Sequence, residues 1–257
     1  NYVRQSKVFL YSMHKNMVIT LTLFYFSYLA AVSGTSMYES YIYSLYNFAL
    51  GLPIVFLGIF DQDISAIFAM TYPQVYSTGL TNSQLSLKGV MKWIWNAILY
   101  GVIFSVISFE VLRDTYEAYD LYLMGTMTYV ALVLSMHMKV ALIHRTINQT
   151  HFWSMFISVF CLFSILYLLN INKVDNYDLY YVASEMYQEK LFWCFSVLTI
   201  PVYTIMIDLV GTSFYVVLWP SREMLYTEAS RTETPHLLQQ QANEATKNSV
   251  PRENVVL

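Results

Sequence analysis

The chain has 257 residues, of which 56% are hydrophobic and 12% are charged, with a formal net charge of −3. A soluble domain carries about 25% charged residues, so the composition excludes an ordinary soluble protein and favours a membrane protein. The negative net charge argues against a nucleic-acid partner. The two cysteines, Cys161 and Cys194, lie in apolar runs without metal-ligand spacing, so we expect buried free thiols and no metal site.

Six apolar runs are long enough to cross a bilayer as helices, which takes about 20 residues. They predict an all-α polytopic membrane protein, a bundle of six transmembrane helices near residues 8–32, 41–59, 91–112, 121–143, 152–170 and 191–213. This membrane domain would fill residues 1–219, and the polar segment 220–257 would be a largely disordered cytosolic tail. Since the chain begins with Asn and shows no signal-peptide pattern, we also expect a fragment of a longer protein.

The distribution of lysine and arginine predicts the orientation in the membrane. If the N-terminus is inside, the cytosolic segments hold Arg4, Lys7, Lys88, Lys92, Lys139, Arg145, Arg222 and Arg231. The outer segments then hold only Arg113, Lys173 and Lys190. Both termini are therefore predicted to be cytosolic.

The first apolar run carries the residues that are most costly to place in a membrane. Lys15 and Asn16 lie several residues inside it, and polar or ionisable groups at that depth indicate a functional site. The helical period predicts one polar face, which would point into the bundle and comprises Ser12, Lys15, Asn16, Thr20, Thr22 and Ser27. The alternative for Lys15 is an anchor whose ammonium snorkels to the cytosolic interface.

The second run holds Asn47, Gly51 and Pro53. Proline frees the carbonyl one turn earlier, near Ala49, and free backbone groups at membrane depth are tolerated only beside protein or water. Asn47 and this break would form the opposite wall of a polar path. The alternative is an ordinary proline kink with a structural asparagine.

The later polar residues predict interfaces rather than chemistry. We expect Asp61 and Asp63 to be a solvated loop cap or docking contact, and Asp208 to lie at a helix end rather than to be a buried acid. His137 lies between two methionines, which suggests copper, but without a matching cluster we expect packing and an interfacial histidine. The chain shows no phosphate-binding loop and no nucleophile with a positioned base, so no catalytic residue is predicted.

Several short motifs follow one another over roughly residues 1–220. They are Tyr2 to Lys7, Leu10-Tyr11-Ser12 with Lys15-Asn16, Tyr38-Glu39-Ser40, Ser44 to Asn47 with Leu52-Pro53, Gly58 to Asp63, and Tyr72 to Tyr76. In this order they resemble the C-terminal membrane half of the phospholipid-transporting P-type ATPases, the lipid flippases. The resemblance implies that the six runs correspond to the fifth to tenth membrane helices of such an enzyme.

The resemblance also implies a role for individual residues. Lys15, Asn16 and Asn47 would line the route of a lipid headgroup. Ser12, His14 and Pro53 would support them, although the family usually has an aromatic residue at the position of His14.

For the parent protein, the resemblance implies ATP-driven movement of phospholipid from the outer or lumenal leaflet to the cytosolic leaflet. ATP and Mg²⁺ would be cofactors of the full-length parent and not of this fragment, because the aspartyl-phosphate motif and the nucleotide domain are absent from the sequence. The fragment alone should therefore have no ATPase activity. The alternative function is a stand-alone passive channel, facilitator or scaffold of six helices.

The implied partners are the phospholipid, the membrane and the upstream phosphorylation and nucleotide domains of the parent. The resemblance adds a glycosylated accessory subunit, for which the outer segments 33–40, 113–120 and 171–190 are the candidate contacts. The expected location is a eukaryotic plasma membrane or endomembrane.

Overall fold

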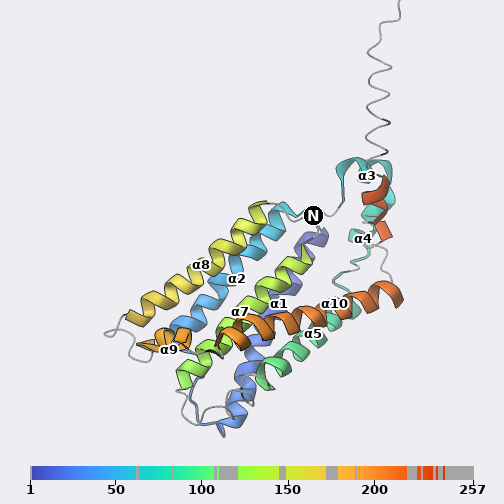
Figure 1. The fold of residues 1–257 in the computed structure, drawn as a ribbon. Helices are drawn as coiled ribbons and strands as arrows, with labels where there is room; N and C mark the ends of the chain where they lie inside the picture. Colours follow the sequence, from blue (N-terminus) through green and yellow to red (C-terminus); the bar gives the residue numbers. More distant parts are fainter. Residues whose placement is uncertain are drawn as a thin grey trace, which may run out of the picture. The chain divides into compact units, whose positions relative to one another are not determined.

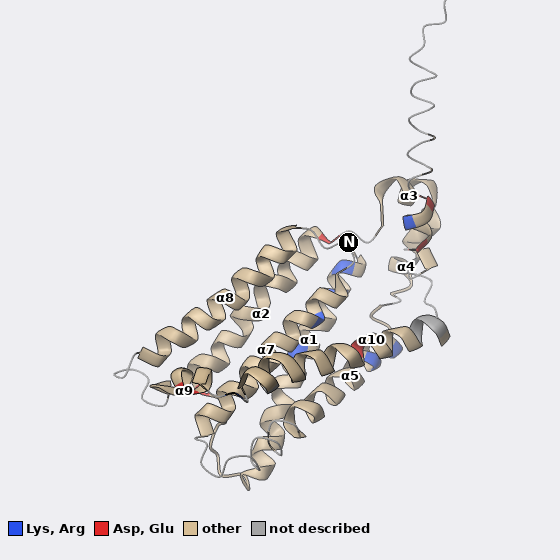
Figure 2. Ribbon diagram, viewed as in Figure 1, with Lys and Arg blue, Asp and Glu red and all other residues tan. Residues whose placement is uncertain are grey.

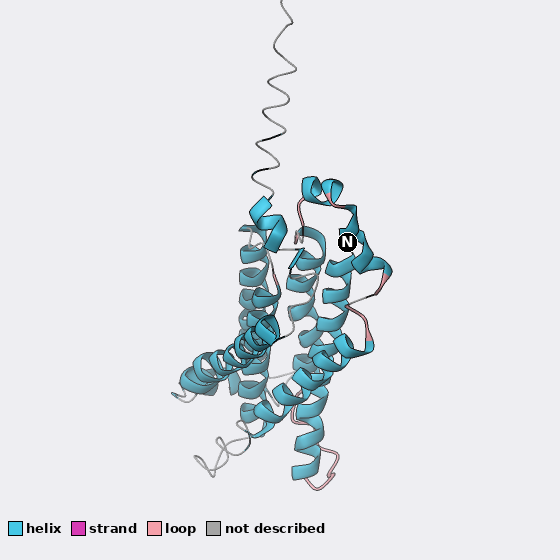
Figure 3. Cartoon of the chain, turned by 90° about the vertical axis from the view of Figure 1, so that its right-hand side faces the viewer, coloured by secondary structure: helices cyan, strands magenta, loops and turns pink. Residues whose placement is uncertain are grey.

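The computed structural model describes residues 2–61, 64–82, 84–106, 109, 121–144, 149–171, 179–188, 190 and 192–218, and parts of 225–240. All regular structure in these residues is helical (Figure 3). The helices are α1 (Tyr2–Leu29), α2 (Ser40–Phe60), α3 (Ala66–Thr71), η1 (Pro73–Tyr76), α4 (Ser77–Leu80), α5 (Leu87–Val106), α7 (Leu121–Ile143), α8 (Gln149–Ile171), α9 (Val182–Gln188), η4 (Phe192–Thr199) and α10 (Ile200–Leu218). The predicted all-α fold is confirmed.

Five helical segments of the described chain are long and apolar enough to cross a membrane: α2, α5, α7, α8 and the continuous stretch Phe192–Phe214. Figure 2 shows how few charged residues the long helices carry. The protein is therefore an integral polytopic membrane protein, but the predicted count of six spans is wrong by this criterion. α1 is long enough, with 28 residues, yet His14, Lys15 and Asn16 in its middle make it less apolar than the other long helices.

The chain folds into two compact units, residues 1–61 with 84–211, and residues 62–83 with 212–257. In the first unit, α1 packs along α5 and α2 packs along α8 (Figure 1). α7 contacts α1, α2, α9 and η4. Of the most apolar part of α7, 72% is buried, against at most 44% for the other four spans. α7 is therefore the central helix of this unit.

The end of α2 is closed by an ion pair. The Asp61 carboxylate lies 3.1 Å from Lys7 Nζ and is buried. Arg4 donates hydrogen bonds to the carbonyl oxygens of Ile59 and Asp61, at 2.9 and 3.1 Å. Asp61 is the C-cap residue of α2, and its contacts with Lys7 and Arg4 also dock α1 against this end. The expectation that Asp61 is solvated is wrong, because it is buried beneath these two side chains. Asp63 lies outside the described residues.

In the second unit, the short helices of residues 62–83 contact the C-terminal segment. Ser65 caps α3 by accepting a hydrogen bond from the Phe68 backbone N–H at 3.2 Å, and its own N–H donates to Ser230 Oγ at 3.4 Å. A hydrogen bond with Glu233 raises the pKa of the Tyr72 phenol. The predicted domain boundary at residue 219 and most of the predicted tail lie outside the described residues.

Both cysteines are free thiols. The prediction that they are buried is wrong, because Cys161 is half-buried and Cys194 is exposed. Both lie on membrane helices, where a thiol on a lipid-facing surface behaves as a small hydrophobic group.

Gly125 of α7 lies against the backbone that follows α1. A Cβ at this position would stand 2.2 Å from the carbonyl oxygen of Met37. We expect Gly125→Ala to displace this backbone and to lower the free energy of unfolding by about 1–3 kcal/mol. Gly211→Ala is the matched control, since no atom lies within 4 Å of its added Cβ. Thermal unfolding in detergent, followed by size-exclusion chromatography, compares the two; equal midpoints would contradict the close approach.

Candidate functional site

Lys15 of α1 and Asn47 of α2 meet in the structure. Lys15 Nζ donates a hydrogen bond to Asn47 Oδ1 at 2.7 Å. The ammonium also lies 5.3 Å from the centre of the Tyr46 ring, and the Tyr46 hydroxyl donates to the Lys15 carbonyl at 2.8 Å. With only 6% of Lys15 exposed, its ammonium engages the neighbouring helix. The structure therefore favours the inward-facing lysine over the snorkelling anchor.

The other predicted site residues divide between buried and exposed positions. His14 is buried, Ser12 is half-buried, and Asn16 and Asn47 are exposed. The prediction that the whole polar face of α1 points into the bundle is wrong for Asn16 and Thr20, both exposed. The face covers an arc of about 160°, which is wider than the part of α1 that its neighbours bury.

Pro53 lies inside α2 and removes the N–H that would bond to the carbonyl of Ala49. The predicted free carbonyl is confirmed, because Ala49 O instead accepts a hydrogen bond from Ser158 Oγ of α8. Protein rather than an open cavity thus satisfies the break in α2, as membrane depth requires.

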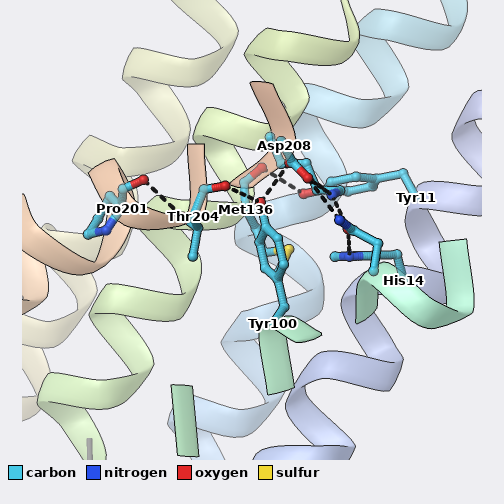
Figure 4. Close-up of polar contacts among 9 residues, drawn as sticks. Tyr11, His14, Tyr100, Met136, Pro201, Thr204 and Asp208 are labelled. Carbon is cyan, nitrogen blue, oxygen red and sulfur yellow. Dashed lines mark hydrogen bonds and ion pairs between the residues drawn. The ribbon is translucent and has the colours of Figure 1, made fainter. Parts of the chain in front are cut away.

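A second group of polar side chains forms what we call the ion-pair cluster: His14, Asn96, Tyr100, Lys139 and Asp208. Lys139 Nζ donates to both Asp208 carboxylate oxygens at 3.1 and 3.0 Å, and to Asn96 Oδ1 at 2.5 Å. Asp208 also accepts from Asn96 Nδ2 at 3.0 Å and from the Tyr100 hydroxyl at 2.6 Å (Figure 4). His14 Nε2 lies 2.8 Å from Asn96 Oδ1. The cluster thereby joins α1, α5, α7 and α10.

The position of Asp208 corrects the prediction of a helix-end residue. Its side chain is 13% exposed and that of Lys139 is 5% exposed. The sequence held one signal of this pair. Lys139 and Asp208 carry opposite charges, and the predicted orientation places both near the same membrane face. Sequence alone does not show that two such helices are neighbours.

His14 also packs against two aromatic side chains of α5. Its ring makes edge contacts with Trp93 and Tyr100, with centroids 5.8 and 5.1 Å apart. A histidine here therefore keeps aromatic packing and adds a hydrogen bond to α5. Among the residues that the structure describes, no three His, Cys, Asp or Glu side chains lie close enough to hold a metal ion.

Removing one charge of the cluster should cost more than removing both. Lys139→Met removes the cation that bonds both oxygens of the Asp208 carboxylate, and Asp208→Leu removes the anion that the Lys139 ammonium bonds, so each should destabilise by about 3–5 kcal/mol. The double variant buries no unpaired charge and should unfold at a higher temperature than either single variant. Melting midpoints of the three variants in detergent measure this order; a double variant less stable than both single variants would contradict the pairing.

The sequence matches a known family over most of its length. Residues 1–221 match the family described as phospholipid-translocating P-type ATPase C-terminal. The chain is 29% identical over 224 residues to a phospholipid-transporting ATPase of Schizosaccharomyces pombe, which covers 81% of this chain and 17% of that protein. It is 26% identical over 237 residues to the probable phospholipid-transporting ATPase DNF3 of Saccharomyces cerevisiae, covering 89% of this chain and 14% of that protein.

A third relative, probable phospholipid-transporting ATPase 5 of Arabidopsis thaliana, is 25% identical over 193 residues, with 67% of this chain and 15% of that protein covered. The chain thus spans less than a fifth of the length of these relatives. Because the family match extends over residues 1–221, the chain belongs to the C-terminal family of the phospholipid-translocating P-type ATPases.

Proposed function

We propose that this chain supplies lipid-path helices to an ATP-driven phospholipid translocase, which moves phospholipid from the outer or lumenal leaflet to the cytosolic leaflet. The observation that carries the proposal is the contact between Lys15 Nζ and Asn47 Oδ1 at 2.7 Å, in a chain whose relatives are named for phospholipid transport. ATP and Mg²⁺ would act in upstream phosphorylation and nucleotide domains. The chain alone would then hydrolyse no ATP.

The partner of Lys15 explains why this lysine can meet a lipid headgroup. Its hydrogen-bond acceptor, Asn47, is neutral, and no acidic side chain among the described residues pairs with it. An ammonium has three donors, and Asn47 Oδ1 accepts from one of them. In a medium of low dielectric constant, an anionic phosphate or carboxylate is a stronger partner than Asn47. The headgroup would therefore compete with Asn47 for the ammonium.

The exposed amides complete this site. Asn47 and Asn16 are both exposed, and their N–H groups would donate to the same headgroup while the acyl tails stay in lipid. His14, the residue before Lys15, contacts Asn96 and so holds α1 to α5. Pro53 sets the backbone of α2. Ser12 enters the site only through its place on the polar face of α1.

Family membership favours this function over a passive channel, facilitator or scaffold of six helices. The full-length protein would lie in a eukaryotic plasma membrane or endomembrane. The outer segments 33–40, 113–120 and 171–190 would be the contacts for a glycosylated accessory subunit.

Lys15→Ala and Asn47→Ala test the site in the full-length ATPase. Loss of a charge-assisted hydrogen bond should raise the lipid concentration for half-maximal ATP hydrolysis roughly 10- to 100-fold in Lys15→Ala, and less in Asn47→Ala. Lys88→Ala removes an exposed lysine of the same charge and should leave the value unchanged. ATP hydrolysis titrated with phosphatidylserine or phosphatidylcholine measures the effect. Unchanged half-maximal concentrations in both site variants would contradict the site.

The proposed orientation places both ends of the chain in the cytosol. An epitope tag fused after Leu257 should therefore be removed by protease added outside sealed microsomes, because that side corresponds to the cytosol. A lumenal marker protein in the same microsomes is the control and should survive. A tag that is protected until detergent is added would reverse the orientation.

A further inference from the structure

Three helices meet at a chain of hydrogen bonds that the headgroup site does not use. His137 of α7 lies 2.8 Å through Nδ1 from the carbonyl oxygen of Val133, and 2.8 Å through Nε2 from Ser158 Oγ of α8. Ser158 Oγ in turn contacts the carbonyl oxygen of Ala49 in α2. His137 and Ser158 are 4% and 3% exposed, so the polar groups of this chain depend on one another.

The number of protons available for these hydrogen bonds depends on the charge of His137. Both carbonyl oxygens only accept, so the three contacts together require three donated protons. A neutral imidazole supplies one and the Ser158 hydroxyl supplies one. If the imidazole proton is on Nδ1, Ser158 must choose between His137 and Ala49. If it is on Nε2, the contact with Val133 sets two lone pairs against each other. Only an imidazolium, with two N–H groups, completes all three contacts.

We propose that His137 is a proton-binding site that positions α2. When His137 is protonated, Ser158 donates its only proton to the Ala49 carbonyl, which Pro53 has deprived of its helical donor. When His137 is neutral, that proton is shared between two acceptors and α2 is held less firmly. The inference rests on the proposed function in one respect: Asn47 lies two residues before Ala49, so the backbone that Ser158 holds also carries the partner of Lys15.

The surroundings of His137 leave its proton exchangeable. Over their described spans, α2 and α8 carry no acidic residue, and their tyrosine, histidine and cysteine side chains have no negative charge near neutral pH. Glu185 of α9 is exposed, and Asp208 of α10 is held by Lys139. From α1, the Tyr11 hydroxyl donates to a backbone carbonyl of α7 at 3.2 Å. No opposite charge among the described residues offsets the burial of the imidazolium, so only its hydrogen bonds to Val133 and Ser158 stabilise the charged form, and it loses its proton as the pH rises.

Hydrogen exchange of α2 tests this site without requiring transport. The full-length ATPase would be placed in nanodiscs of phosphatidylcholine and phosphatidylserine, and exchange of residues 50–57 followed from about pH 5.5 to 8.5. After correction for the intrinsic exchange rate, we expect protection to fall about five-fold as the pH rises, the effect of one hydrogen bond. Ser158→Ala and His137→Gln should remove this pH dependence, because the first cannot donate and the second cannot gain a proton.

Ser154→Ala is the matched control on the same helix. Ser154 is as buried as Ser158, but its hydroxyl donates at 2.8 Å to the carbonyl of His151 within α8, so its loss should leave the pH dependence intact. Equal pH dependence in the wild type and Ser158→Ala would overturn the proposal, as would its loss in Ser154→Ala. Because exchange is measured without ATP, this result is separate from lipid stimulation in Lys15→Ala, which tests the proposed function itself.

Discussion

The charge of Lys139 sets the condition that the rest of the first unit must meet. An ammonium surrounded by apolar helices is costly to bury, and an opposite charge beside it, with the remaining hydrogen bonds satisfied, offsets much of that cost. Asp208 provides that charge at 3.0 Å, while Asn96 and Tyr100 fill the remaining positions around the carboxylate. These partners come from α5, α7 and α10, and His14 extends the network to α1. The five residues of the ion-pair cluster thus connect four helices.

Lys139 and Lys15 illustrate how the partner of a buried lysine determines its role. Lys139 is paired with a carboxylate, and separating the two would leave two buried charges unpaired. Lys15 is paired with the neutral Asn47 and can give up its partner to an anion at lower cost. Both lysines are buried. Lys139 therefore suits a structural role in holding helices together, and Lys15 suits the proposed substrate path.

Sequence predicted the elements well and their neighbours poorly. The apolar runs located five membrane spans, and Pro53 predicted an unsatisfied carbonyl at Ala49, because both depend on residues close in sequence. The meeting of Lys15 and Asn47 was proposed from a polar face and from family resemblance. The pairing of Asp208 with Lys139 was missed, since charge and depth can be derived from one helix but contact requires the packing of two.

The polar middle of α1 also has a consequence for biogenesis. A segment that is less apolar than the other spans partitions less readily into lipid when it leaves the ribosome alone. Its buried His14 and Lys15 find hydrogen-bond partners in α5 and α2, which are synthesised later. Stable insertion of α1 would therefore depend on those helices, so the residues proposed to contact lipid would also delay the entry of α1 into the bilayer.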